Sequence, residues 1–114
     1  MVAYEYEGLS KEIEKVVKNY FYNFEYGTES FCITYNSWNI KKYSFSIYSS
    51  TYNYGVRMLL KGDTDINAFK KEVKAILKNN GFTKVSFIIK KNIIKGGAFG
   101  DYETKQLVGI DFDK

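Results

Sequence analysis

Two pairs of carboxylates are the residues of this sequence whose types and spacing come nearest to a catalytic or metal-binding site. Asp63 with Asp65, and Asp111 with Asp113, could act as metal ligands or as acid–base groups. The first pair lies where the caps of a helix are expected, and the second lies in a segment that is expected to fray. The chain has no histidine, which excludes an imidazole base, a Ser-His or Cys-His nucleophile pair and an ordinary zinc site. We therefore expect neither enzyme activity nor a metal or other cofactor.

The single cysteine, Cys32, alternates with Phe31 and Ile33 in an expected strand, which is typical of a structural thiol. With no base to activate it, Cys32 is not expected to act as a nucleophile, and alone it cannot form an internal disulfide. No apolar run approaches the ~18 residues of a membrane span, and the acidic N-terminal segment lacks the features of a secretory signal. These observations predict a cytoplasmic protein that does not enter a membrane.

The glycine-rich segment 96–100 (GGAFG), flanked by Lys95 and Asp101, has a composition that could suit a phosphate-binding loop. It lacks the Gly-Lys-Ser/Thr ending of a P-loop and the strand-to-helix setting of a dinucleotide-binding fold. We expect a flexible solvent loop, or else a hairpin tip whose Phe99 docks into a partner protein.

Basic side chains gather in the middle of the chain. Residues 41–100 carry twelve basic and three acidic side chains, a net charge of +9 within a total of +4. Such a surface can hold a phosphate backbone or an acidic protein. A plain solvated lysine-rich face is the open alternative, because lysine without arginine reads bases poorly. The candidate binding residues on the second expected helix and the strand after it are Lys70, Lys71, Lys74, Lys90, Lys91 and Lys95.

The tract 43–54 (YSFSIYSSTYNY) alternates aromatic rings with hydroxyl side chains. Tyr48, Tyr52 and Tyr54 could stack on single-stranded bases or anchor a protein interface. The Lys/Arg-Gly-Phe/Tyr strand of an RNA-recognition motif is not present. A tyrosine-rich sheet face followed by a turn is the alternative that stays open for this tract.

Apolar residues recur at helical spacing from Leu9 to Phe24 and predict a first amphipathic helix over this range. Ser10 is the expected N-cap, because a serine side chain can accept a hydrogen bond from the first free backbone N–H groups. The segment 26–28 (YGT) is expected to end this helix.

A second helical period runs from Asp65 to Asn80, with Asp63 and Asp65 as the two candidate N-caps. Gly81 is expected to take the left-handed conformation that ends many helices, because glycine adopts a positive φ without steric cost. Phe82 is then expected to contact Leu77, which would complete a Schellman motif.

The apolar period changes to two outside the helices and predicts five half-buried strands. Short polar connections favour an antiparallel meander for the first three strands. The resulting order predicts a single α+β domain over residues 1–114, whose antiparallel or mixed five-stranded sheet carries both helices on one face. The expected strands cover residues 31–35, 43–48, 56–61, 85–94 and 108–112.

This order of elements resembles the tail-terminator and neck proteins of long-tailed bacteriophages, which are small α+β subunits that assemble as a ring on the tail tube. The two helices of that family would correspond to Leu9–Phe24 and Asp65–Asn80, and its closing strand to residues 102–113 (YETKQLVGIDFD). The resemblance lies in element order and size over most of the chain, and it implies no catalytic residues.

Two functions stay open from the sequence. The first is a non-enzymatic structural or interaction protein of a phage or related mobile element, most concretely a ring-forming tail or neck component. Such a protein self-associates, is made in the host cell and is carried in the virion, and neighbouring subunits cover its free sheet edges. The second is a small binding module that acts on nucleic acid, or as an inhibitor on a host defence protein, through the lysine-rich face.

Overall fold

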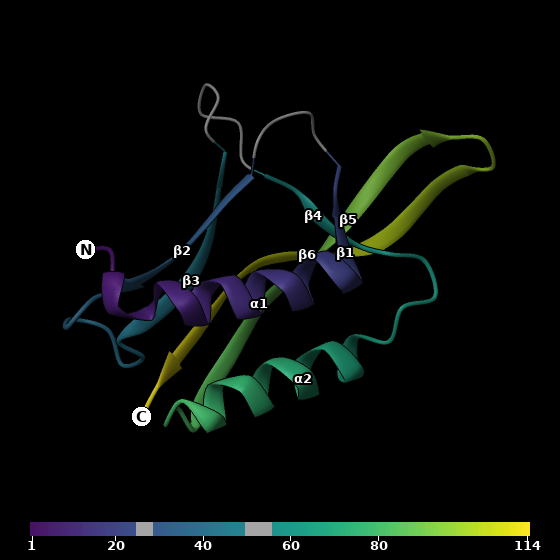
Figure 1. Ribbon diagram of the computed structural model, residues 1–114. Helices are drawn as coiled ribbons and strands as arrows, with labels where there is room; N and C mark the ends of the chain where they lie inside the picture. The colour runs from purple at the N-terminus through teal and green to yellow at the C-terminus, as the bar shows by residue number, and fades with distance from the viewer. Residues whose placement is uncertain (25–28, 50–55) are drawn as a thin grey trace.

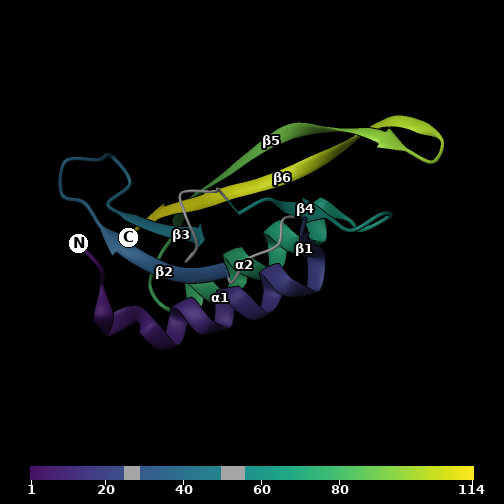
Figure 2. The same ribbon diagram turned by 90° about the horizontal axis from the view of Figure 1, so that it is seen from above.

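The protein folds as an antiparallel sheet with two helices on one of its faces (Figure 1). The structure is a computed structural model that describes residues 1–24, 29–49 and 56–114. The helices, α1 (Glu7–Tyr20) and α2 (Ile66–Asn79), contact each other along this face. The predicted α+β class is therefore confirmed, as is the placement of both helices on the same side (Figure 2).

Helix α1 begins and ends earlier than its apolar period predicts. It follows directly from a short 3-10 turn, η1 (Tyr4–Tyr6), so Ser10 lies inside the helix, is buried and is not the N-cap. The helix ends at Tyr20 because the next three residues form the strand β1 (Phe21–Asn23), which pairs with a strand much later in the chain. A period of three to four residues cannot reveal such a distant partner. The predicted stop at 26–28 lies outside the described residues.

Helix α2 has the start and the end that its sequence predicts. The Asp65 side chain accepts a hydrogen bond from the backbone N–H of Asn67 at 2.8 Å and caps the helix. At the other end, Gly81 has a φ of +87°. The Phe82 N–H then donates to the Leu77 carbonyl at 2.9 Å, which is the long hydrogen bond of a Schellman motif. This motif fixes the direction in which the chain leaves α2 for the sheet.

The sheet has six antiparallel strands, one more than predicted, in the order β1-β4-β6-β3-β2, with β5 paired to the other side of β6. The predicted meander is confirmed for its first two strands, since β2 and β3 are antiparallel neighbours. It is wrong for the third strand, because β6 lies between β3 and β4. Strand order depends on contacts between distant segments, which local alternation does not specify. Besides β1, the strands are β2 (Glu29–Tyr35), β3 (Tyr43–Ser49), β4 (Met58–Leu60), β5 (Lys84–Gly97) and β6 (Gly100–Asp113).

Aromatic rings join the helices to the sheet in the core. Phe69 of α2 is fully buried, and its ring centroid lies 4.9 Å from that of Phe21 in β1 and 5.7 Å from those of Tyr20 and Phe87. The Tyr20 hydroxyl also donates a hydrogen bond to the Glu72 carboxylate of α2. One ring therefore touches α1, β1 and β5, which holds α2 in place beneath β5.

The face of the sheet opposite to the helices, the outer face, carries small polar side chains. Ser44 lies beside the buried Phe45 in β3 and so points to the outer face, where its Oγ donates to the Asp111 carboxylate at 2.6 Å. Leu59 of β4 also points outward, and it is buried outside the main core cluster. The outer face is therefore polar over β3 and β6 and apolar near β4.

The hairpin of β5 and β6 extends beyond the rest of the sheet (Figures 1 and 2). The strand β4 pairs with β6 only as far as Gln106, so residues 91–105, the arm, pair as strands only with each other in the described part of the chain. Of the two expectations for the glycine-rich segment, the flexible loop is wrong and the hairpin tip is confirmed, because strand ends joined by a tight turn form residues 96–101. A Cβ on Gly97 would lie 2.8 Å from the Gly100 carbonyl oxygen, so the turn requires glycine there.

Replacing Gly81 tests whether the end of α2 is as strongly specified as its geometry indicates. We expect Gly81→Ala to lower the free energy of unfolding by about 1 to 2 kcal/mol, because alanine adopts a positive φ only at a steric cost. The control is Gly8→Ala within α1, where a Cβ meets nothing within 4 Å. This variant is expected to gain about 0.5 to 1 kcal/mol. Urea unfolding followed by circular dichroism measures both, and equal effects of the two changes would contradict the assignment.

Candidate functional site

Three of the four carboxylates that could have formed a reactive pair have structural partners instead. Asp65 caps α2, Asp111 accepts the hydrogen bond from Ser44, and Asp113 accepts one from the backbone N–H that follows it at 2.8 Å. Asp63 is an exposed residue of the turn before α2. Among the described residues, no three side chains of the metal-ligating types come together.

The Cys32 thiol lies on the outer face of β2, because its neighbour Ile33 belongs to the core. Burial raises the pKa of Cys32 above its usual 9.0, and this outweighs the positive N-terminus and a hydrogen bond with Tyr48, which act the other way. A thiol with a raised pKa is protonated at neutral pH and is a poor nucleophile. The position supports a structural role for Cys32.

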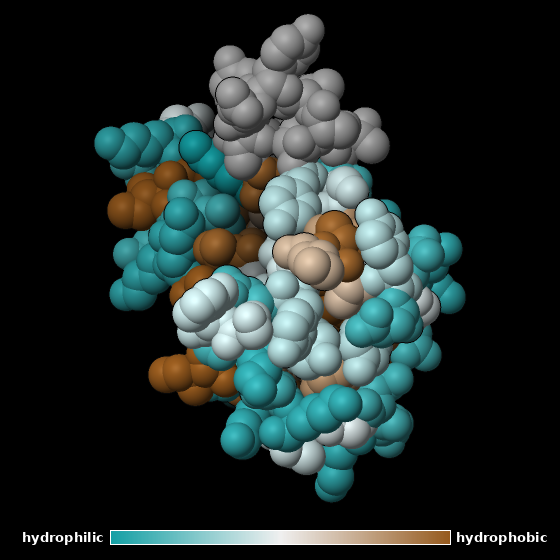
Figure 3. Space-filling model, turned by 90° about the vertical axis from the view of Figure 1, so that its left-hand side faces the viewer, coloured by the Kyte–Doolittle hydropathy of each residue, from teal (hydrophilic) through white to brown (hydrophobic). Residues whose placement is uncertain are grey.

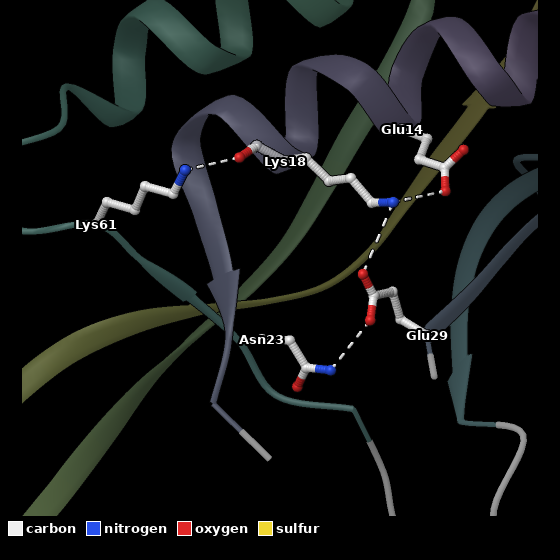
Figure 4. Close-up of polar contacts among 5 residues, drawn as sticks. All are labelled: Glu14, Lys18, Asn23, Glu29 and Lys61. Atoms are coloured by element: carbon white, nitrogen blue, oxygen red, sulfur yellow. Dashed lines mark hydrogen bonds and ion pairs between the residues drawn. The ribbon is translucent and has the colours of Figure 1, made fainter. Parts of the chain in front are cut away.

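A polar cluster joins the end of α1 to two strands and to Lys61, the residue after β4 (Figure 4). The Lys18 ammonium lies 3.2 Å from the Glu14 carboxylate and 3.7 Å from that of Glu29 in β2. Asn23 of β1 donates to Glu29 at 3.2 Å, and the Lys61 ammonium donates to the Lys18 backbone carbonyl at 2.8 Å. Hydrogen bonding from its own backbone N–H lowers the pKa of the Glu29 carboxyl, helped by Asn23 and Lys18 and opposed by burial. Each group in the cluster is satisfied by a neighbour, which is typical of a structural network.

Lysines of α2 lie next to β5. Lys70, Lys74 and Lys78, the lysine stripe, are four residues apart and so lie along one side of the helix. The Lys70 ammonium lies 5.8 Å from the centroid of the Phe87 ring in β5. Lys74 and Lys78 line a groove of about 430 Å³ together with Phe82, Thr83 and Val85.

The other candidate lysines do not join this stripe. Lys71 is exposed and lies about 100° around α2 from Lys70. Lys90 and Lys91 are consecutive in β5 and point to opposite faces of the sheet. Lys91 lies opposite Lys105 in the register of the arm, and Lys95 lies near its tip. The structure thus divides the six lysines of the predicted face between a helix, two sheet faces and the arm.

The loop between β2 and β3 lies at the end of the molecule that Figure 3 faces, where hydrophobic residues are scattered among hydrophilic ones. Trp38 and Ile40 are 93% and 92% exposed. Trp38 borders a hollow of about 460 Å³ over the outer face, beside Ser86 and Asp111. The larger hollow at this end, the Trp38 hollow, has a volume of about 480 Å³ and is lined by Met1, Thr34, Tyr35, Asn36, Ser37, Trp38 and Tyr48.

Of the three candidate tyrosines, the structure places one. Tyr48 is half exposed and lines the Trp38 hollow, whereas Tyr52 and Tyr54 lie outside the described residues. Trp38 and Ile40 were not predicted as site residues. A usable signal was present, because an aromatic residue in the polar turn stretch 36–39 (NSWN) has no strand or helix to carry it into the core.

Phe99 stands at the tip of the arm and is fully exposed, at 105% of its reference area. It lies in the tight turn between Gly97 and Gly100, where the backbone gives its ring nothing to pack against. Figures 1 and 2 both place this tip at the end of the molecule opposite to the loop of Trp38. An isolated exposed apolar residue is ordinary, but a ring held out on a hairpin is a typical contact for another protein.

Comparisons with known proteins give no relative from which a function of this site could be transferred. No family model, no curated protein and no solved structure matches this chain. Within residues 1–24, 29–49 and 56–114, none of the helices has the length and apolar character needed to cross a bilayer.

The lowered pKa of Glu29 makes part of the stability depend on pH. A carboxyl whose pKa is lower in the folded state stabilises the fold above its unfolded value, near 4.5, and loses this contribution as the pH falls through the folded value. We expect Glu29→Gln to cost less than about 1 kcal/mol at pH 7, since the ion pair is partly open to water. The cost should disappear in acid below the lowered pKa. Urea unfolding across this pH range is the measurement, with exposed Glu12→Gln as the control. A cost that persists in acid would refute the role of the charge.

Proposed function

We propose that this protein is a non-enzymatic assembly subunit that associates head to tail with copies of itself. Phe99 at the tip of the arm is the inserted side chain, and the Trp38 hollow of the next copy is the receiving surface. The observation that carries the proposal is the placement of these two features at opposite ends of the molecule (Figure 2). Its longest dimension is 45 Å, against 32 and 23 Å for the other two.

Both ends of the molecule present aromatic rings. Burying a phenylalanine side chain contributes roughly 2 to 3 kcal/mol, and contacts between aromatic rings add to this. The hollow offers the rings of Tyr35, Trp38 and Tyr48, and its volume of about 480 Å³ lies in the range of sites that bind ligands. Exposed Trp and Tyr side chains are also the residue types that dominate binding energy in protein interfaces.

A contact between two different ends of the same subunit leaves one free end of each kind on every dimer. Such heterologous contacts therefore continue until the chain of subunits closes into a ring or grows as a filament. A symmetric contact, in contrast, would stop at two copies. A head-to-tail contact is compatible with a ring-forming subunit, and a tail or neck component of a bacteriophage is the most concrete form of this proposal. The closing hairpin of β5 and β6 is the element of that resemblance which would make the contact, and such a subunit is made in the host cell and carried in the virion.

Complementary substitutions test the head-to-tail contact. We expect the unchanged protein to form discrete oligomers at micromolar concentration, and Phe99→Asp and Trp38→Asp to be monomers. Each variant keeps one intact end, so an equimolar mixture should form a dimer and nothing larger. Light scattering coupled to size-exclusion chromatography measures the masses, and Phe99→Leu, which keeps an apolar tip, is expected to assemble.

Three results would overturn this proposal. A strictly monomeric protein at high micromolar concentration has no such interface. A Trp38→Asp variant that still forms dimers while Phe99→Asp does not would indicate a symmetric contact between two tips. Oligomers that survive both changes would place the interface elsewhere.

A further inference from the structure

The second edge of β5 is unpaired in the described part of the chain. β5 is hydrogen-bonded to β6 from Lys84 to Gly97, and none of the other described strands pairs with it. Its free edge therefore presents a row of backbone N–H and C=O groups, the feature to which a further strand can add. This surface is distinct from the tip and from the Trp38 hollow.

Apolar side chains line this edge on the side of the helices. Val85, Phe87 and Ile89 alternate along β5 and pack partly against the core, so that each is half buried. Val85 stays partly open, because it lines the groove beside Lys74 and Lys78. An additional strand at this edge would bury more of it.

The lysine stripe runs beside two of these residues, Phe87 and Val85. Lys70 reaches the ring of Phe87, and Lys74 and Lys78 line the groove with Val85, so the helix and the strand lie alongside each other over this stretch. Four residues of an α-helix rise about 6 Å, and two residues of a β-strand rise about 6.6 Å. The spacing of the three lysines therefore nearly matches that of every second side chain of an added strand.

We propose that the free edge of β5, between Lys84 and Ile89, accepts an extended acidic peptide segment of another protein as an additional strand. Acidic side chains at alternate positions of this segment face the lysine stripe, and their methylene groups pack on Val85 and Phe87. The residues between them point to the side of Ser86 and Ile88. The backbone supplies the hydrogen bonds, and the lysines select the charge and the alternation.

Charge decides between the occupants that this edge could take. If a second copy of β5 paired with this edge, Lys84, Lys90 and Lys91 of one copy would lie near the same three residues of the other copy. Like charges on neighbouring strands repel. A nucleic acid satisfies the lysines, but its phosphates leave the strand edge without the donors and acceptors of a peptide backbone. An acidic peptide meets both requirements at once.

Three peptides of equal charge test the proposal by fluorescence anisotropy. The probe is fluorescein-labelled TEVEVEVT, which has a glutamate at every second position. TEEEVVVT has the same composition in blocks, and TEVEPEVT has a proline that removes one backbone N–H. We expect the first to bind about tenfold or more tightly than the other two. Hydrogen exchange should show new protection of residues 84–89 when TEVEVEVT is added.

Charge reversal at the stripe is the second arm. We expect Lys74→Glu to weaken binding of TEVEVEVT by about tenfold or more, and Lys15→Glu on the exposed side of α1 to change it by less than about twofold. Both are made in the Phe99→Asp background as well as in the unchanged protein. The affinity for TEVEVEVT should be the same in the two backgrounds, because Phe99→Asp removes the proposed assembly contact and leaves the edge of β5 unchanged. The peptide result therefore tests strand addition independently of assembly.

The proposal is overturned if the three peptides bind equally, because charge without strand addition would then explain the affinity. It also fails if none of them binds at millimolar protein, or if a short oligothymidylate displaces TEVEVEVT at a lower concentration than the unlabelled peptide does. That last result would assign the stripe to phosphate. Equal loss of binding in Lys74→Glu and Lys15→Glu would show that only net charge matters.

Discussion

β6 pairs with three other strands, and the shape of the protein follows from where each of these pairings stops. β5 pairs with β6 over the whole length of β6. On the other side of β6, β3 pairs with residues 109–112 and β4 pairs with residues 106–107, so this side has no partner strand before Gln106 among the described residues. Leu107, Ile110 and Phe112 of β6 are fully buried where all these strands meet. Beyond this point β6 pairs only with β5 among the described strands, and the two strands form the arm. The same arrangement places β5 outermost, with one edge unpaired among the described residues.

The result is a molecule whose exposed features are separated by position and by chemistry. The two ends of the long axis carry aromatic rings, and the long side between them carries the unpaired edge of β5 and the lysine stripe. An edge strand with exposed backbone groups tends to pair with copies of itself, and lysines on the strand oppose this. Lys84, Lys90 and Lys91 therefore oppose pairing of this edge with a second copy, whereas the proposed assembly contact uses the two ends. Both kinds of contact can then exist on one subunit at the same time.

Local sequence signals predicted most helices and strands. Where the prediction failed, contacts between residues far apart in the sequence determine the structure. Asp65 and Gly81 marked α2 correctly because a cap and a left-handed glycine act on their own helix. Phe21 continued the period of α1, yet it forms a strand because its partner Leu60 lies 39 positions further along the chain. For the site, the helical period alone groups Lys70 with Lys74, and the strand period alone separates Lys90 from Lys91. The Trp38 hollow could not be predicted from the sequence, because its lining combines the N-terminal Met1 with residues of β2, β3 and the loop between them.

The lysine stripe has a consequence for how selective the edge of β5 can be. Ion pairs between exposed lysines and carboxylates contribute at most about 1 kcal/mol each and weaken with salt, so three of them do not hold a partner by themselves. Lysine is also a point charge on a flexible stem, which accepts a carboxylate from many directions, unlike the planar fork of arginine. Geometric selection must therefore come from the backbone edge, which admits only an extended chain in register. In the proposed complex, the lysines raise the association rate and select an acidic partner, and the backbone edge selects an extended peptide conformation.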